Sequence, residues 1–294
     1  MKRLVKIISV LFLIASAVLM FSEIAQAANK RSAKEMTFLA VGFDSAPENT
    51  DVLCVITYDS EAKTVRAIQI PRDTAIKYGD GVIKINGFYS CEKAKGRTRE
   101  QALSNLADKI SSLLGIGIDG YFALTTDGFA KTVDYLGGVS IDAALIPKVI
   151  SDAYYVENGK IHLDGEAALD FVRYRKDYPR GDLDRIDAQK VFLKSVFNLL
   201  KEKRDYFSFL KFISSCNEIS FKINKGYSLA FVLQNISKAS ETDFQIATLP
   251  GRALKSGGVW YYVVNKAEAK ALIDGYFPHG NPSFDGEVGF AYDM

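Results

Sequence analysis

The sequence has little of what builds a metal cluster or a disulfide framework. Its 294 residues include two histidines and three cysteines, Cys54, Cys91 and Cys216, and no two of the cysteines stand at metal-binding spacing. A histidine-rich zinc site is therefore not expected. Cys54 lies in an apolar run and is predicted to be a buried core thiol. A disulfide between Cys91 and Cys216 stays open as an alternative.

Most of the chain also has no excess of positive or negative charge. The 37 Lys and Arg outnumber the 35 Asp and Glu by two. The first 28 residues hold this whole excess, because Lys2, Arg3 and Lys6 are opposed there only by Glu23. The remaining body is neutral and has no stripe of interleaved aromatic and basic residues, which argues against nucleic-acid binding. Any anion site must then be a local cluster.

Internal repeats and low-complexity stretches are absent as well. With 48% hydrophobic and 24% charged residues, the chain is too apolar and too balanced in charge for disorder. It suits one folded unit of roughly 250 residues with room for a second small lobe.

A long apolar run is found only near the N-terminus. The three basic residues named above precede apolar residues 7–21, and Ala25-Gln26-Ala27 follows as a small-x-small cleavage pattern. This predicts either a cleaved signal peptide or an uncleaved membrane anchor over residues 1–28. The run of about 15 residues is short for a membrane span. Both alternatives place the body outside the cytoplasm, either at the outer face of the cytoplasmic membrane or secreted.

Strand and helix patterns alternate along the chain, which predicts an α/β layered fold. Strands are expected at 37–42, 51–58 and 64–70, and a polar turn joins the last two as a hairpin, so the sheet is at least mixed. Apolar residues at helical spacing predict a helix over 99–114 that Gly115 ends. The further expected elements are strands 121–124 and 139–141 and helices 127–136, 165–171 and 184–201.

The hairpin brings charged residues together at its open end. If its turn is centred near residue 61, the numbers of paired residues sum to about 123, so Asp51 lies opposite Arg72 with Asp73 beside them. Two neighbouring carboxylates need a cation or a proton between them, and hard oxygen ligands suit Mg²⁺ or Mn²⁺. The alternative is a turn cap and a surface ion pair.

Two later segments carry arginines suited to phosphate. If residues 172–175 are extended, Arg173 and Arg175 face the same way and present two guanidinium forks; a solvated strand edge is the alternative. Arg185 and Gln189 share one face in the first turns of the next helix, where the helix dipole favours an anion. The predicted anion-binding residues are Arg72, Lys84, Arg173, Arg175, Arg185 and Gln189. With the two carboxylates, this set matches a pyrophosphate and a divalent metal.

These residues stand in segments that resemble the LytR-CpsA-Psr (LCP) family, in one order from about residue 36 to residue 204. The matching segments are Phe38-Leu39-Ala40-Val41-Gly42, Asn49-Thr50-Asp51, Ile70-Pro71-Arg72-Asp73-Thr74, Lys84-Ile85-Asn86, Leu113-Leu114-Gly115-Ile116 with Asp119, Leu136-Gly137-Gly138-Val139, Leu163-Asp164-Gly165-Glu166-Ala167-Ala168-Leu169, Val172-Arg173-Tyr174-Arg175, and Gly181-Asp182 with Arg185 and Gln189. Their shared order makes the resemblance specific. One segment departs from the family, because Asn49 stands where an arginine is usual, and one positive charge is lost.

The resemblance implies a three-layer α/β/α fold with a mixed central sheet and an apolar pocket for a lipid. It also implies a catalytic core at residues 36–204, with residues 205–294 expected as an α/β extension that packs on the core and completes its sheet. It also implies a transferase at the membrane surface that moves wall teichoic acid, capsule or a similar glycopolymer from a polyprenyl pyrophosphate carrier to peptidoglycan, using Mg²⁺. In the family's pattern Asp51 and Asp73 would take the places next to the metal. Arg72, Arg173, Arg175 and Arg185 would bind the diphosphate, with Gln189 beside them.

The resulting hypothesis is a phosphoryl transfer. The C6 hydroxyl of an N-acetylmuramic acid unit attacks the phosphorus that bears the glycan, Asp73 or Asp51 orients or deprotonates this hydroxyl, and polyprenyl phosphate leaves. Two alternatives stay open on the same fold. One is a non-catalytic envelope regulator that binds polyprenyl phosphate, and the other is a pyrophosphatase in which water replaces the sugar.

Overall fold

A computed structural model describes residues 35–43, 49–59, 62–146, 148–174, 215–223, 244–277 and 280–284, together with isolated helical residues between 188 and 213. The predicted leader at residues 1–28 lies outside the described residues, as do Arg175, Arg185 and Gln189. Within the described part of the chain, no helix combines the length and the apolar character needed to cross a membrane.

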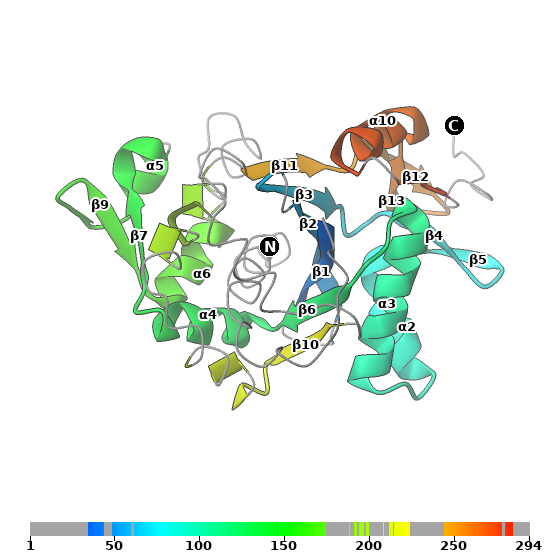
Figure 1. The fold of residues 1–294 in the computed structure, drawn as a ribbon, viewed down its shortest axis with the longest axis horizontal. Helices are drawn as coiled ribbons and strands as arrows, with labels where there is room; N and C mark the ends of the chain where they lie inside the picture. The colour runs from blue at the N-terminus through cyan, green and yellow to red at the C-terminus, as the bar shows by residue number, and fades with distance from the viewer. Residues whose placement is uncertain are drawn as a thin grey trace.

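A six-stranded sheet forms the centre of the molecule (Figure 1), in the strand order β10-β6-β1-β2-β3-β11. Its strands are β1 (Glu35–Phe43), β2 (Thr50–Asp59), β3 (Thr64–Ile70), β6 (Gly120–Leu124), β10 (Ile219–Ile223) and β11 (Phe244–Thr248). The β1–β6 and β11–β3 pairs are parallel and the other three pairs are antiparallel. The predicted mixed α/β sheet is thus confirmed. Both of its edge strands come from beyond residue 204.

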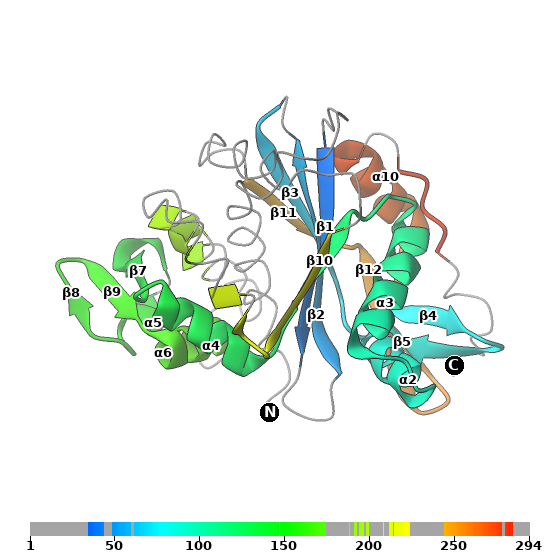
Figure 2. The same ribbon diagram turned by 60° about the horizontal axis from the view of Figure 1, so that its bottom comes forward.

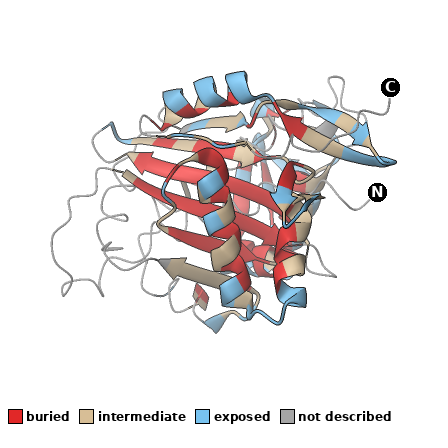
Figure 3. Cartoon of the chain, turned by 90° about the vertical axis from the view of Figure 1, so that its right-hand side faces the viewer, coloured by how far each residue is buried: buried red, intermediate tan, exposed pale blue. Residues whose placement is uncertain are grey.

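Helices cover both faces of this sheet and give three layers (Figure 2). On one face lie α2 (Phe88–Ala94), α3 (Arg99–Leu114) and α10 (Lys266–Tyr276), and on the other lie α4 (Thr126–Tyr135) and α6 (Gly165–Arg173). Alternate residues of β1 divide between the two cores: Leu39 and Val41 pack toward α3, whereas Phe38 and Ala40 pack toward α4 and α6. The central strands are buried, and exposed residues lie on the outer sides of the covering helices (Figure 3).

The first of these cores is closed by helix α3, whose ends are set by its own sequence. The Thr98 side chain accepts from the Gln101 backbone N–H while the Gln101 side chain accepts from that of Thr98, a reciprocal capping box. At the other end Gly115 adopts the left-handed conformation. A Cβ there would lie 1.8 Å from the carbonyl oxygen of Asn281, and the Asn281 N–H donates to the Gly115 carbonyl at 3.0 Å. Gly115 therefore ends the helix and also leaves room for the backbone of Asn281 to pack against it.

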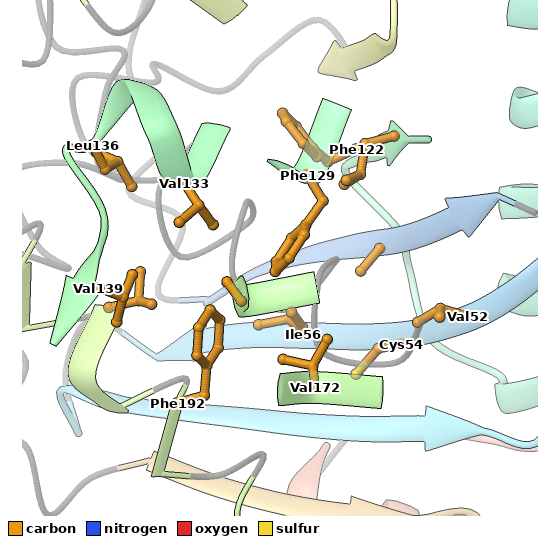
Figure 4. Packing of buried hydrophobic residues seen from close by; sticks show 14 of the residues in the cluster. Val52, Cys54, Ile56, Phe122, Phe129, Val133, Leu136, Val139, Val172 and Phe192 are labelled. Atoms are coloured by element: carbon orange, nitrogen blue, oxygen red, sulfur yellow. The ribbon is translucent and has the colours of Figure 1, made fainter. Parts of the chain in front are cut away.

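The second core gathers apolar side chains from β1, β2, α4 and α6 (Figure 4). Phe129 of α4 and Phe192 pack with ring centroids 6.0 Å apart, near Ile56 and Cys54 of β2. Phe192 falls in the predicted helix 184–201, whose described residues are helical. Cys54 is fully buried, as expected, and burial raises the pKa of its thiol far above the ordinary range. Among the described residues, the charged ones classed as buried are Asp51 and Glu92, and Glu92 lies on α2 in the opposite layer.

Three small sheets surround the centre, and the sequence patterns predict only one of their strands, 139–141. They are the hairpin β4 (Ala75–Tyr78) and β5 (Gly81–Lys84), the hairpin β12 (Gly251–Ser256) and β13 (Val259–Val264), and the three-stranded sheet of β7 (Val139–Asp142), β9 (Lys160–Leu163) and β8 (Val156–Glu157). The short elements are η1 (Ile85–Gly87), η2 (Ala143–Leu145) and α5 (Lys148–Ser151).

Two expectations need correction. Residues 172 and 173 are not extended, because α6 continues through Arg173, and the backbone becomes extended only at Tyr174. The reason is tertiary: Phe171 and Val172 are buried in the core beside α4, so the helix that carries them is retained. The open alternative of a disulfide is also wrong, since Cys91 and Cys216 are both free thiols.

Candidate functional site

Asp51 owes its position to an irregularity in the β1–β2 ladder. Gly42 pairs with Val52 but Phe43 pairs with Thr50, so Asp51 is an extra residue on β2 that lacks a partner in β1. Such a β-bulge locally redirects the strand and its side chains. At this end of β2, the Thr50 side chain points toward the segment that leads into α2, because its hydroxyl donates to the Asn86 carbonyl at 3.3 Å. The bulge thus places a carboxylate at the end of the sheet.

Arg72 lies across from this carboxylate, as the hairpin register predicts. The observed pairs run from Asp59 with Thr64 to Leu53 with Ile70, which carries Arg72 to the level of Asp51. Arg72 Nη1 donates to Asp51 Oδ1 at 3.1 Å. The Asp51 side chain is only 3% exposed, and its other oxygen, Oδ2, is buried with no hydrogen-bond partner among the described residues. Leaving such a group unmatched costs about 1–3 kcal/mol.

Asp73 completes a row of alternating charges. Its Oδ1 lies 3.9 Å from Arg72 Nε and 3.2 Å from Lys84 Nζ. The order along the row is therefore Asp51, Arg72, Asp73 and Lys84, with Arg72 between the two acids. Asp73 is 35% exposed and Asp51 is 3% exposed, so a molecule arriving from solvent meets Asp73 first. The structure thus brings together four of the residues that the sequence marked.

The turn that carries Arg72 and Asp73 is held on two sides by distant backbone. The Thr74 N–H donates to the Pro71 carbonyl at 2.9 Å, which closes a β-turn with Arg72 and Asp73 at its centre. The Arg72 carbonyl accepts from the Asn86 N–H at 3.0 Å, and the Asp73 carbonyl accepts from the Tyr262 N–H at 2.8 Å. Both charged side chains therefore stand on a fixed backbone. No sequence pattern marks Tyr262, because it contacts Asp73 only through the fold.

Arg173 approaches from the other helical layer. It ends α6, whose start lies beside the end of α4 because the Gly165 N–H donates to Asp134 Oδ1 at 2.7 Å. Burial lowers the pKa of the Arg173 guanidinium, and the nearby carboxylates of Asp170 and Asp127 oppose this. Its Nε is buried with no hydrogen-bond partner among the described residues. No ion pair joins Arg173 to the row of four in the described chain, so its predicted diphosphate role stays a prediction.

The donor atoms of the row fit a hard divalent cation in part. Asp51 Oδ2 is a buried carboxylate oxygen without a partner among the described residues, and Asp73 supplies a second carboxylate. Within the described part of the chain, no group of three or more His, Cys, Asp or Glu side chains gathers. Two protein carboxylates with substrate phosphate and water are what Mg²⁺ commonly takes. The residues present are therefore compatible with the predicted ion.

Comparison with known proteins identifies the family of this chain. The model of the LytR_cpsA_psr family matches residues 15–275. The chain belongs to the LytR-CpsA-Psr family. The match extends past the segments that carried the resemblance and includes β10, β11 and the β12–β13 hairpin, which contacts Asp73. The family model thus covers residues 205–275 as well.

Curated relatives of this LCP protein have names from cell-wall synthesis. The cell wall biosynthesis protein LcpA of Corynebacterium glutamicum is 31% identical over 254 residues, which cover 78% of this chain and 48% of that protein. The Bacillus subtilis polyisoprenyl-teichoic acid–peptidoglycan teichoic acid transferase TagV is 31% identical over 192 residues, 61% of this chain and 47% of that protein. For the transferase TagU of the same organism the identity is 28% over 79% of this chain and 71% of that protein. The chain thus spans about half the length of LcpA and TagV.

Solved structures share the fold of this LCP protein. Lin1025 of Listeria innocua aligns with a TM-score of 0.66 at 21% identity, over 84% of this chain and 98% of that one. B. subtilis TagV aligns with a TM-score of 0.62 at 24% identity, over 85% and 98%. TagT bound to LI-WTA gives 0.62 at 18% identity, over 88% and 96%. At these identities the likeness concerns the fold alone, and it confirms the LCP architecture.

Proposed function

We propose that this LCP protein transfers a glycopolymer, such as wall teichoic acid or capsule, from a polyprenyl pyrophosphate carrier to peptidoglycan, forming a phosphodiester link. The observation that carries the proposal is the fixed row in which Arg72 lies between Asp51 and Asp73 and leaves one buried oxygen of Asp51 without a partner among the described residues. Membership in the family and the transferase names of TagU and TagV support it.

The proposed step is an in-line displacement at phosphorus. The C6 hydroxyl oxygen of an N-acetylmuramic acid unit bonds to the phosphorus that bears the glycan. The bond from that phosphorus to the bridging oxygen breaks, and polyprenyl phosphate leaves. The hydroxyl proton passes to Asp73, which we favour over Asp51 as the base because it is the more exposed carboxylate. Asp73 then returns the proton to solvent.

The cations of the row have a separate task in this proposal. Arg72 and Lys84 lie within ion-pair distance of Asp73 and would offset the negative charge that gathers on the diphosphate oxygens. Arg173, together with Arg175, Arg185 and Gln189, would bind the same diphosphate from the other helical layer. A bound Mg²⁺ or Mn²⁺ would be held by Asp51 and Asp73 and would neutralise further charge on the diphosphate.

The place of action follows from the same proposal. Residues 1–28 would serve as a signal peptide or membrane anchor, so that the domain works at the outer face of the cytoplasmic membrane or in the wall. The carrier lipid would lie in an apolar pocket against the α4–α6 layer, whose core side chains are apolar. Such a position brings together a membrane-borne donor and a wall-borne acceptor.

A lipid-linked donor assay with peptidoglycan fragments as acceptor tests the proposal. Asp73→Ala and Arg173→Ala are each expected to abolish transfer while the circular-dichroism spectrum is kept. Asp80→Ala is the matched control, because Asp80 is an exposed carboxylate on the β4–β5 turn, and it should transfer at the wild-type rate. Wild-type transfer by both test variants would refute the site. Release of polyprenyl phosphate and free glycan phosphate without glycan–peptidoglycan product would indicate a pyrophosphatase instead.

A further inference from the structure

Arg99, the first residue of α3, has buried charged atoms that no partner among the described residues explains. Its guanidinium carbon lies 5.1 Å from the centre of the Phe43 ring, a cation–π distance. Its Nε and Nη2 atoms are buried and have no hydrogen-bond partner in the described chain. Because a guanidinium keeps its charge and has five donors in a fixed fork, removing it from water without acceptors is unfavourable. This environment would favour an anionic ligand.

The position of Phe43 places this cation beside the row of charges. Phe43 ends β1 and pairs with Thr50, directly next to the bulged Asp51. Its ring packs on Tyr89 of α2 with centroids 4.7 Å apart, in the layer toward which Thr50 also turns. In the strand order, β2 lies between β1 and β3. Asp51 thus has Arg72 on its β3 side and the Arg99–Phe43 pair on its β1 side.

The described carboxylates around α3 are already engaged elsewhere. Glu100 lies 3.2 Å from Lys222, and Glu92 accepts from Tyr78, Lys95 and Asn105. The phenol of Tyr121 interacts electrostatically with Arg99, but burial, aided by Glu100, raises the pKa of Tyr121 to about 12, so it is neutral at physiological pH. Arg99 therefore packs on Phe43, whose ladder partner Thr50 precedes Asp51, and keeps buried guanidinium atoms without a partner in the described chain. The negative oxygens of a phosphate would accept hydrogen bonds from the buried N–H groups of Arg99.

We propose that Arg99 binds a non-bridging phosphate oxygen of the lipid diphosphate donor and so forms a second arm of the anion site, opposite Arg72. This assignment rests on the proposed function, because it concerns the donor of that reaction. The Phe43 ring supports the guanidinium from one side. Two guanidinium groups that approach from different sides hold a diphosphate in one orientation. Arg99 is thus a substrate-positioning residue from the α3 layer.

Calorimetric titration of the full-length chain with farnesyl pyrophosphate in the presence of Mg²⁺ tests this assignment, with farnesol as the uncharged probe. Arg99→Gln removes the charge and should weaken the affinity for farnesyl pyrophosphate at least tenfold, about 1.4 kcal/mol. Arg99→Lys should fall between wild type and Arg99→Gln. The matched control is Arg97→Gln, since Arg97 is exposed two residues before Arg99; its affinity should stay within about twofold of wild type. None of the variants should change the response to farnesol.

The outcomes separate the two proposals. If wild type binds farnesyl pyrophosphate and Arg99→Gln binds it equally well with a lowered unfolding temperature, Arg99 is only a packing residue and the assignment is overturned alone. If wild type itself fails to bind farnesyl pyrophosphate, the proposed diphosphate site fails, and the role of Arg99 with it. In the transfer assay, a raised KM for the donor in Arg99→Gln with kcat nearly kept would support a positioning role.

Discussion

Two buried carboxylates, Glu92 on helix α2 and Asp51 on strand β2 of the sheet beneath it, differ in how completely they are hydrogen-bonded. Glu92 of α2, with a side chain 8% exposed, accepts from Tyr78 Oη at 2.8 Å, Lys95 Nζ at 3.2 Å and Asn105 Nδ2 at 2.6 Å. Both of its oxygens are matched. Asp51, 3% exposed, accepts from Arg72 with one oxygen, and the other has no partner in the described chain. Glu92 thus links α2 to α3 and β4, whereas Asp51, at the end of the sheet, has one carboxylate oxygen without a described partner.

On the proposed function, this difference separates a structural group, Glu92, from a functional one, Asp51. A satisfied buried network stabilises the fold, because each member would lose its partner on unfolding or mutation. An unmatched buried carboxylate lowers stability, so its retention needs another reason, and ligand binding supplies one. The three predictions that follow test this contrast by asking which variant loses activity and which loses stability.

Changing Asp51 should have the largest effect, and on activity. Asp51→Asn keeps the shape and one acceptor for Arg72 but removes the charge, so transfer should fall at least about 100-fold. Because the lost oxygen had no described partner, the unfolding temperature should stay within about 3 °C of wild type. Transfer assays and thermal scans on the same preparation measure both. Full activity in Asp51→Asn would show that transfer does not need the charge of Asp51 and would contradict the prediction.

Changing Glu92 should have the next largest effect, and on stability. Glu92→Ala takes the acceptor from the half-buried hydroxyl of Tyr78 and the half-buried amide of Asn105, which should lower the free energy of unfolding by about 2–3 kcal/mol. For a domain of this size that corresponds to roughly 5–10 °C in unfolding temperature. Transfer per folded molecule should change less than about twofold. A variant that is fully stable but inactive would show that Glu92 acts in the site instead.

The pH dependence of the Glu92 network should show the smallest effect. Burial raises the pKa of Glu92, but the hydrogen bonds from Asn105, Tyr78 and Lys95 outweigh it, and the net pKa lies below the usual 4.5. A carboxyl group with a lowered folded-state pKa contributes stability above its unfolded pKa, and this contribution is lost as the pH falls through the folded value. Wild type should therefore be more stable than Glu92→Gln at neutral pH and lose this advantage below about pH 4. A constant difference in thermal midpoints from neutral pH down to about pH 3 would contradict the prediction.

Local sequence was enough for several parts of the site. The hairpin between β2 and β3 has the predicted register, so the spacing of residues around its turn is sufficient to place Arg72 opposite Asp51. Helix α3 has the predicted bounds, Arg99–Leu114, because its capping box and Gly115 lie in the sequence itself. These features depend on neighbours a few residues apart or on a short turn, so pattern and spacing carry them.

Other parts of the site depend on contacts that span the chain. The bulge at Asp51 arises where β1 and β2 slip by one residue, which neither strand shows alone. Lys84 pairs with Asp73 only because the β4–β5 hairpin folds back beside it. Arg173 remains helical, against the pattern of its neighbours, because the core retains Phe171 and Val172. In each case packing energy outweighs local preference.

The sequence by itself determined the β2–β3 hairpin, helix α3 and the identity of the charged residues, since periodicity, caps and turns act over a few residues. Only the tertiary structure decided which of those charges are matched. Whether Glu92 finds three partners, and whether Asp51 and Arg99 keep unmatched atoms among the described residues, depends on how distant segments converge at one end of the sheet. The physical reason is that burial, which makes an unpaired charge unfavourable, is a property of the packed molecule and not of any segment.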